Sequence, residues 1–286
     1  MSSAPAGTQG AGTLFLVSTP IGNLGDMTYR AVEVLSSTAL VIAEDTRHSR
    51  RLLDHYGIAT PLRSYHEHNE AKETPNLIDR LLKGDSIALI SDAGTPLVSD
   101  PGARLVDAAL AHGVKVVPIP GASAVMAALV GAGLPLDRFA FFGFLPRKGK
   151  ARKEAIAEIA GSAVTAVLYE APGRVADTLE EISGAGARER RAVVARELTK
   201  QFEEFRRGSV AELADVYRKA DPRGEVVILV AGGGADRAQV TEGELTAAAA
   251  TLRAAGNSAR EVMEYLVSDL RAPRNVAYRI AHQKES

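Results

Sequence analysis

The sequence contains no cysteine and no tryptophan, and aromatic residues make up only 5% of it. Without thiols the chain can form no disulfide, no thiolate metal site and no cysteine nucleophile. The shortage of aromatic rings argues against a broad platform for stacking bases. No apolar run is long enough to cross a bilayer. The formal net charge is -1, so any contact with nucleic acid has to come from local basic patches.

What remains is the composition of a soluble globular protein, since 46% of the 286 residues are hydrophobic and 24% are charged. This length allows one large domain or two domains that each have a core. Residues 1–12 lack the basic start and the apolar middle of a signal peptide. We therefore expect a disordered leader over residues 1–12 and a cytoplasmic protein.

Two apolar runs, Ile87–Ile90 and Val114–Ile119, have the length and β-branched content of buried parallel strands. Each leads into a loop of glycine, proline and small polar residues, and each loop opens a helix. This arrangement places ligands at the carboxyl ends of a parallel sheet. Ordinary turns are also rich in glycine and proline, but two such loops in succession favour a binding cleft. The residues that would supply it are Asp92, Gly94, Thr95, Ser99, Gly102, Gly121 and Ser123.

The same alternation of strand and helix extends along most of the chain. In the first half it predicts an open parallel sheet that is covered on both faces. The sharpest change in composition is the basic run Arg147–Lys153, where we place the domain boundary. The predicted fold class is α/β, with an N-terminal α/β domain over 13–146, a second α/β domain over 147–234 and a small helical C-terminal extension over 241–286.

Several common sites are not supported by the sequence. No G-x-G-x-x-G motif follows a strand, so a dinucleotide site is not indicated. The segment Gly143–Lys150 resembles a phosphate loop only superficially, because its glycines are one residue too far apart. His66 and His68 could offer metal ligands, but no third ligand stands at a defined spacing. A solvated polar loop is the simpler interpretation, although the same residues could face a substrate.

The segment Glu44–His48 follows a predicted strand directly and combines two acids, an arginine and a histidine. Catalytic groups are expected at this end of a strand, but Asp45 could equally cap the next helix. Arg196–Lys200 follows a strand of the second half with the same ambiguity. The basic run Arg147–Lys153 would suit phosphate contacts or could be a solvated linker.

Seven motifs occur in a fixed order: LFLVSTPIGNLGDMTYRA, AEDTRHSRRLL, LISDAGTPLVSDPG, VVPIPGASA, GFLPRK, LYEAPGR and ARELTK. Together they resemble the ribosomal small-subunit RNA 2′-O-methyltransferases of the tetrapyrrole-methylase superfamily. The resemblance covers about Leu14–Gly232, and the C-terminal helices resemble the helical extension of the same family. It implies two α/β domains of the tetrapyrrole-methylase type with S-adenosylmethionine (SAM) in the cleft between them. It further implies a homodimer, no metal, no membrane, and methylation of a cytidine ribose 2′-hydroxyl in the decoding region of 16S rRNA.

The resemblance also implies which residues hold the cofactor. They are Pro20, Gly22, Asp92, Gly94, Thr95, Val98, Gly121, Ser123, Ala124, Leu168, Tyr169 and Ala195. Members that act on tetrapyrroles often carry Gly-Asp-Pro where this chain has Gly94-Thr95-Pro96. This departure argues against a tetrapyrrole substrate.

A 2′-hydroxyl is a poor nucleophile until its proton begins to leave, so a base should stand nearby. Glu44, Asp45, His48 and His66 are the candidates, and the sequence does not decide between them. Arg47, Arg147, Lys148 and Lys200 are the candidates for holding phosphates of the RNA. Two other functions stay open: a SAM-dependent methylase of a tetrapyrrole, and a ribosome-binding factor that holds SAM without catalysis. The partner would be 16S rRNA or the 30S subunit.

Overall fold

The computed structural model describes residues 10–233, 242–270 and 272–282. The chain divides into two compact units, the first ending at Gly232 and the second beginning at Gly233. Most of the predicted leader, residues 1–9, lies outside the described residues. Its last residue is ordered, because Gly12 is buried and donates its N–H to the carbonyl of Leu81 at 2.8 Å.

The first sheet is entirely parallel and has the strand order β3-β2-β4-β1-β5. Its central strands are short and almost wholly apolar, as expected for strands covered on both faces. The strands are β1 (Thr13–Val17), β2 (Leu40–Ala43), β3 (Leu62–Ser64), β4 (Ile87–Ile90) and β5 (Lys115–Ile119).

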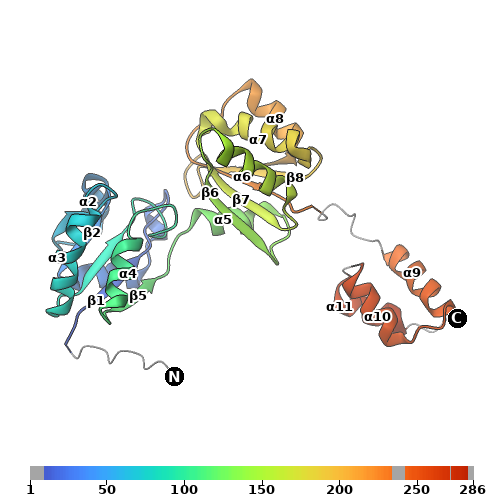
Figure 1. The fold of residues 1–286 in the computed structure, drawn as a ribbon, viewed down its shortest axis with the longest axis horizontal. Helices are drawn as coiled ribbons and strands as arrows, with labels where there is room; N and C mark the ends of the chain where they lie inside the picture. Colours follow the sequence, from blue (N-terminus) through green and yellow to red (C-terminus); the bar gives the residue numbers. More distant parts are fainter. Residues whose placement is uncertain (1–9, 234–241, 271, 283–286) are drawn as a thin grey trace. The chain divides into compact units, whose positions relative to one another are not determined.

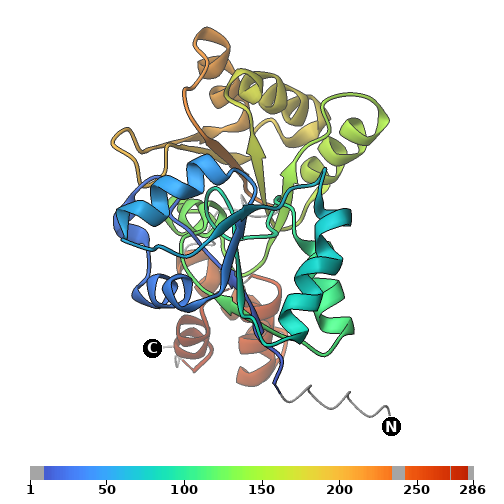
Figure 2. The same cartoon turned by 90° about the vertical axis from the view of Figure 1, so that its left-hand side faces the viewer.

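Helices cover both faces of this sheet, and Figure 2 shows them on either side of its strands. One core, around Leu35 and Leu53, lies under α1 and α2, and the other, around Leu77 and Leu105, lies under α3 and α4. The helical segments are η1 (Leu24–Asp26), α1 (Tyr29–Ser37), α2 (Thr46–His55), α3 (Glu70–Leu82) and α4 (Ala103–Ala111).

The second sheet is mixed and has the order β6-β7-β10-β8-β9. Strand β10 runs antiparallel to both of its neighbours, so it begins beside the ends of β7 and β8, where Val226 pairs with Glu170 and with Arg196. The strands are β6 (Phe139–Phe144), β7 (Thr165–Glu170), β8 (Arg191–Arg196), β9 (Glu204–Ser209) and β10 (Val226–Val230).

Three helices lie over one face of the second sheet (Figure 1), and their apolar residues form its largest core. The helix α5 packs against β8, β9 and β10 instead. The helical segments here are α5 (Ala124–Ala132), α6 (Lys150–Gly161), η2 (Pro172–Arg174), α7 (Val175–Ile182), η3 (Ser183–Ala187) and α8 (Val210–Lys219).

The domain boundary predicted at Arg147 falls too late in the chain. Strand β6, which the prediction assigned to the first domain, belongs to the second sheet, and α5 packs on that sheet. Moreover, the basic run is not a linker, since α6 already begins at Lys150. The change in composition reflects the charged surface of this helix. The chain passes from the first sheet to the second earlier, between the end of β5 and the start of α5.

The second unit is a group of three helices with its own core, built around Leu245, Val262, Leu266 and Ile280. Ser258 and Glu261 form a capping box at the start of α10, a strong local signal for a helix start. The helices are α9 (Glu242–Ala254), α10 (Ala259–Ser268) and α11 (Arg274–His282). Thr241 and residues 283–286, at the two ends of the predicted extension, lie outside the described residues, as does Arg271.

No helix within the described ranges is both long and apolar enough to cross a membrane.

Candidate functional site

Three loops meet at the carboxyl edge of the first sheet. Thr19, after β1, and Gly94, after β4, exchange two backbone hydrogen bonds of 2.9 and 3.1 Å. The hydroxyl of Thr95 lies 3.2 Å from the Ser18 Oγ and donates to the carbonyl of Ala122, also at 3.2 Å. Thr95 therefore joins the loops after β1, β4 and β5, as the parallel arrangement of the strands predicts.

A cavity of about 360 Å³, termed the main cavity, lies beside these loops. Both sheets contribute to its walls. The lining residues are Ile21, Asp92, Ala93, Gly94, Thr95, Val98, Ser99, Asp100, Ser123, Ala124, Phe144, Tyr169, Glu170, Ala171, Pro172, Gly224, Glu225, Val226 and Val227.

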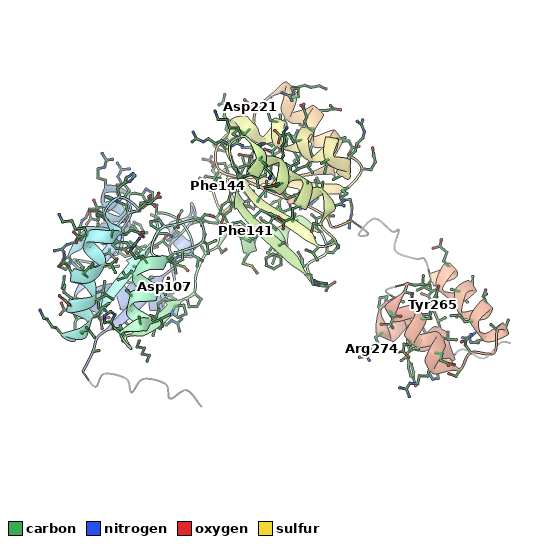
Figure 3. The ribbon with its side chains drawn as sticks, in the orientation of Figure 1. Asp107, Phe141, Phe144, Asp221, Tyr265 and Arg274 are labelled. Carbon is green, nitrogen blue, oxygen red and sulfur yellow. The ribbon has the colours of Figure 1, made fainter. Side chains whose placement is uncertain are left out.

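Aromatic residues of the second sheet form one wall. Figure 3 shows Phe144 on β6 at the margin of this sheet, and its ring centroid lies 5.3 Å from that of Tyr169 on β7. Although it lines the main cavity, Phe144 is 63% exposed. An exposed apolar ring beside a cavity is available for contact with a ligand.

The main cavity is acidic, with Asp92, Asp100, Glu170 and Glu225 in its walls. Burial, together with the nearby charges of Glu44 and Asp92, raises the pKa of Asp100 to about 6, although a hydrogen bond with Ser91 opposes the shift. Like charges held together in this way repel one another, so a cationic ligand would relieve the repulsion.

Two loops beside the main cavity contain non-glycine residues with left-handed backbone. Leu97 and Ser99 have φ of 71° and 66° in the loop after β4, and Glu197 and Thr199 have φ of 50° and 65° in the loop after β8. Each such residue costs about 1 to 3 kcal/mol, and such strain is concentrated at functional sites.

Seven of the residues predicted to hold the cofactor line the main cavity: Asp92, Gly94, Thr95, Val98, Ser123, Ala124 and Tyr169. Pro20 and Gly22 line a neighbouring cavity instead. Gly121 lines neither, and its importance is steric, because a Cβ there would lie 2.9 Å from the Cβ of Ser18. Leu168 and Ala195 are fully buried, and Leu168 packs in the core beneath the helices. Alternation along β7 turns Tyr169, and not Leu168, towards the main cavity.

The neighbouring cavity, termed the minor cavity, has a volume of about 260 Å³. Four of its lining residues, Ile21, Asp92, Ala93 and Glu225, also line the main cavity. The other lining residues are Pro20, Gly22, Leu24, His48, Arg51, Leu52 and Lys200.

The four candidate bases are placed differently. Asp45 caps α2 by accepting the N–H groups of Arg47 and His48, at 2.8 and 3.3 Å, and these bonds lower the pKa of its carboxyl group. A carboxylate with a lowered pKa is a weaker base. Glu44 is exposed, and His48 lines the minor cavity.

His66, the fourth candidate, lines neither the main cavity nor the minor cavity. Its ring lies edge-on to that of His68, with centroids 5.9 Å apart. Its Nδ1 atom is buried and has no hydrogen-bond partner among the described residues.

Two of the predicted RNA ligands, Arg147 and Lys148, lie on a basic hollow of about 600 Å³ that also includes Lys153. Lys200 is different, because its ammonium group pairs with Glu197 at 2.9 Å and with Glu225 at 3.2 Å. Partial burial lowers the pKa of Lys200, but these hydrogen bonds outweigh it and raise the pKa overall. Arg47, also predicted, is exposed and lies 3.7 Å from Asp45.

Arg152, in the middle of the basic run, is only 5% exposed and is part of the protein interior. Its Nε donates to Glu181 at 2.8 Å and its Nη2 to the Thr178 hydroxyl at 2.9 Å. That hydroxyl in turn donates to Glu170 at 2.5 Å, and Glu170 lines the main cavity. Arg152 therefore supports the cavity wall from behind.

Sequence reasoning missed the part of the main cavity made by Gly224–Val227, as well as Asp100 and Phe144. The glycine at 224, which has φ of +83°, was a signal that could have been used. No cluster of three or more His, Asp or Glu side chains suited to a metal ion occurs in the described part of the chain.

Comparison with known proteins places these observations in a family context. Residues 13–214 match the family model for Tetrapyrrole (Corrin/Porphyrin) Methylases. The chain is 51% identical over 245 residues to the ribosomal RNA small subunit methyltransferase I of Pseudomonas aeruginosa, covering 85% of each chain. It is 43% identical over 276 residues to that of Synechocystis sp., covering 96% of this chain and 99% of the relative.

A solved structure of uroporphyrin-III C-methyltransferase from Thermus thermophilus, complexed with S-adenosyl homocysteine, has a similar fold. The TM-score is 0.56 at 19% identity, and the alignment covers 77% of this chain and 97% of the other. The expected fold of two α/β domains is thereby confirmed.

Proposed function

Because this chain belongs to the tetrapyrrole methylases and, within them, to the ribosomal RNA small subunit methyltransferase I family, we propose that it methylates RNA of the small ribosomal subunit. The reaction we propose transfers a methyl group from SAM to the ribose 2′-hydroxyl of a cytidine in the decoding region of 16S rRNA. The observation that carries the proposal is the acidic main cavity, built from the glycine loops that the family motifs supply.

The residues of the main cavity fit SAM. Gly94 has φ of +84°, and a Cβ there would lie 3.2 Å from Ile21, so glycine keeps this part of the wall open. SAM carries a sulfonium and an ammonium group, and Asp92 and Asp100 offer carboxylates to such cations. Phe144 and Tyr169 offer apolar rings to its adenine.

When bound, SAM supplies a methyl group that is already activated by the sulfonium. The chain has to align the acceptor oxygen with this methyl group, exclude water and accept the hydroxyl proton. The contacts of Thr95 with the loops after β1 and β5 help to align the reactants, since they fix three loops of the cavity relative to one another.

Positive side chains outside the cavities would hold the RNA backbone. Arg47, Arg147 and Lys148 are exposed, so they can form charge-assisted hydrogen bonds with phosphates. Lys200, whose ammonium group is held by two carboxylates, is better suited to shaping the minor cavity. In the C-terminal unit, the side chain of Arg274 extends from the start of α11 (Figure 3).

We assign the C-terminal unit to substrate recognition, because it has a core of its own and every cofactor motif precedes it. A chain truncated after Gly233 should stay folded, bind SAM normally and methylate 30S subunits at least tenfold more slowly. Full activity of the truncated chain would make this unit dispensable, and loss of SAM binding would make it part of the catalytic core.

We also propose a cytoplasmic homodimer that works without a metal ion. Met126 and Val130 lie one turn apart on α5 and are 51% and 71% exposed, which leaves an apolar face for a second copy. Sedimentation equilibrium of the wild type and of Val130→Glu tests this, because the charge should shift the protein towards monomers.

Mapping of ribose methylation after incubation of unmethylated 30S subunits or free 16S rRNA with the protein and labelled SAM tests the main proposal. A single modified cytidine in the decoding region is the expected result. Transfer of label to a tetrapyrrole, but not to RNA, would support the alternative of a small-molecule methylase. Binding of SAM without any transfer would indicate a ribosome-binding factor.

A further inference from the structure

The minor cavity lies next to the main cavity and has a different chemical character. Its lining includes the charged side chains of Arg51 and Lys200 and the imidazole of His48, whereas the main cavity is acidic. The two cavities share Ile21, Asp92, Ala93 and Glu225. An occupant of one cavity can therefore come close to an occupant of the other at this shared wall.

Direct methyl transfer requires two adjoining binding sites of this kind, because the acceptor atom has to approach the methyl carbon to about 3 to 3.5 Å. The basic hollow around Arg147 does not meet this requirement, since none of its lining residues lines the main cavity. It can hold RNA backbone, but not the reacting ribose.

Two carboxylates stand in the shared wall, and they differ in what they bind. Glu225 forms an ion pair with Lys200 at 3.2 Å. Asp92 accepts the backbone N–H of Asp45 on its Oδ1 atom, at 3.1 Å, and forms no ion pair among the described residues. The other oxygen of Asp92 thus remains available in a half-buried position, while Asp45, the N-cap residue of α2, holds the carboxylate in place.

We infer that the minor cavity takes the target nucleotide and that Asp92, in the wall common to both cavities, accepts the proton of the attacking ribose hydroxyl. This inference rests on the proposed function. The volume of about 260 Å³ suits a ribose or a pyrimidine, and not a macrocycle. A nucleotide turned out of its neighbours' stack would enter from the side of Arg51, as enzymes acting on single nucleotides require.

The step balances without a further reactant. A bond forms between the ribose oxygen and the methyl carbon, and the bond between that carbon and the sulfur breaks. Its electron pair stays on the sulfur, which becomes the neutral thioether of S-adenosylhomocysteine. The hydroxyl proton passes to the free oxygen of Asp92 and leaves to solvent afterwards.

Asp92→Asn tests the proton acceptor, because an amide keeps the shape and can still accept the Asp45 N–H. We expect kcat on unmethylated 30S subunits to fall by about 10²- to 10⁴-fold. The Kd for SAM, measured by calorimetry, should rise by less than about tenfold, and the melting temperature should stay the same. Asp45→Asn is the matched control, since asparagine also caps helices, and it should lose less than about threefold in kcat.

Arg51→Ala tests the occupant of the minor cavity. The KM for 30S subunits should rise about tenfold, with kcat within threefold of the wild type and an unchanged Kd for SAM. Arg50→Ala is its control, because Arg50 belongs to the same helix and lines neither cavity.

The outcomes separate this inference from the proposed function. If the wild-type protein methylates 30S subunits but Asp92→Asn retains kcat within threefold, the assignment of Asp92 is wrong. An unchanged KM in Arg51→Ala would show that the target nucleotide does not bind in the minor cavity. A wild-type protein that transfers no methyl group to RNA would overturn the proposed function itself.

Discussion

The two sheets meet the main cavity in different ways. In the first sheet every strand is parallel, so the loops after β1, β4 and β5 all reach the same edge. In the second sheet β10 is antiparallel to β7 and β8, so its beginning lies beside their ends. The first sheet therefore lines the cavity only with loops at the carboxyl ends of strands, whereas the second also contributes Gly224–Val227, at the amino end of a strand.

This difference implies that substitution of a glycine should weaken SAM binding to different extents in the two walls. Gly94 lies within the cluster of loops, and a Cβ added there would lie 3.2 Å from the Ile21 side chain and 3.7 Å from the carbonyl oxygen of Ala122. Gly224 is backed by a side chain, the carboxylate of Glu197. The Glu197 side chain can move aside, whereas the backbone of Gly94 is fixed by two hydrogen bonds with Thr19 in the joined loops. Substitution in the first wall should therefore have the larger effect.

Gly94→Val should have the largest effect on cofactor binding. The new side chain would occupy a residue with φ of +84°, and its Cβ would already lie 3.2 Å from Ile21. We expect the Kd for SAM to rise about 100-fold, or about 3 kcal/mol. Gly113→Val is the control, because Gly113 has φ of +71° and no atom within 4 Å of its Cβ position. Calorimetry should show normal SAM binding in the control. Normal binding in both variants would show that the loop around Gly94 is not part of the cofactor site.

Gly224→Ala should have a smaller effect on the same measurement. Its Cβ would collide with the Glu197 carboxylate, which also binds Lys200 and the N–H of Glu225. We expect the Kd for SAM to rise about tenfold, or about 1.4 kcal/mol. Gly133→Ala, with φ of +73° and an open surrounding, provides the control. An effect as large as that of Gly94→Val would contradict the proposed difference between the walls.

The wall made by the second sheet also depends on Arg152, which lies behind Glu170. Arg152→Met removes one of the two guanidinium groups beside the buried Glu170, the other being Arg174 at 3.7 Å, and it also removes the donor to the Thr178 hydroxyl. Loss of one partner of a buried pair costs about 3 kcal/mol. The melting temperature should fall by roughly 5 to 10 °C. Lys148→Ala, in the same basic run, should leave the melting temperature unchanged and reduce the salt dependence of RNA binding by about 0.7 to 0.9 in log–log slope. Equal stability of the two variants would show that Arg152 is not structural.

The contrast between the sheets also explains which features the sequence could predict. Gly94, Thr95 and Ser123 were predictable because strand ends of a parallel sheet share one edge. The contribution of Gly224 was not, since the direction of β10 depends on pairing between distant segments.

The basic run illustrates a second limit of sequence reasoning. The composition of 147–153 indicates charge, but not that Arg152 turns inward while Lys148 stays exposed. Likewise, the choice of Tyr169 over Leu168 as the residue facing the main cavity depends on which face of β7 is covered by helices.

Asp100→Asn should have the smallest effect, and the size of its effect on stability depends on pH. The pKa of Asp100 is raised from 3.8 to about 6, mainly by burial and then by Glu44 and Asp92. Above pH 6 the folded protein therefore holds a carboxylate that the unfolded chain would solvate better. Between pH 6 and pH 4 the folded state takes up a proton that the unfolded state does not, so this group's contribution to stability improves as the pH falls.

The amide variant should consequently be more stable than the wild type at pH 7.5, by on the order of 1 kcal/mol because the group is partly solvated. This advantage should shrink as the pH falls towards 4. The same variant should bind SAM about fivefold more weakly at pH 7.5, because the cavity loses a negative charge that faces the cationic ligand. Thermal melting from pH 4 to 7.5 and calorimetry at pH 7.5 measure the two effects. A variant that gains no stability, or binds SAM as tightly as the wild type, would show that Asp100 is not a charged part of the cofactor wall.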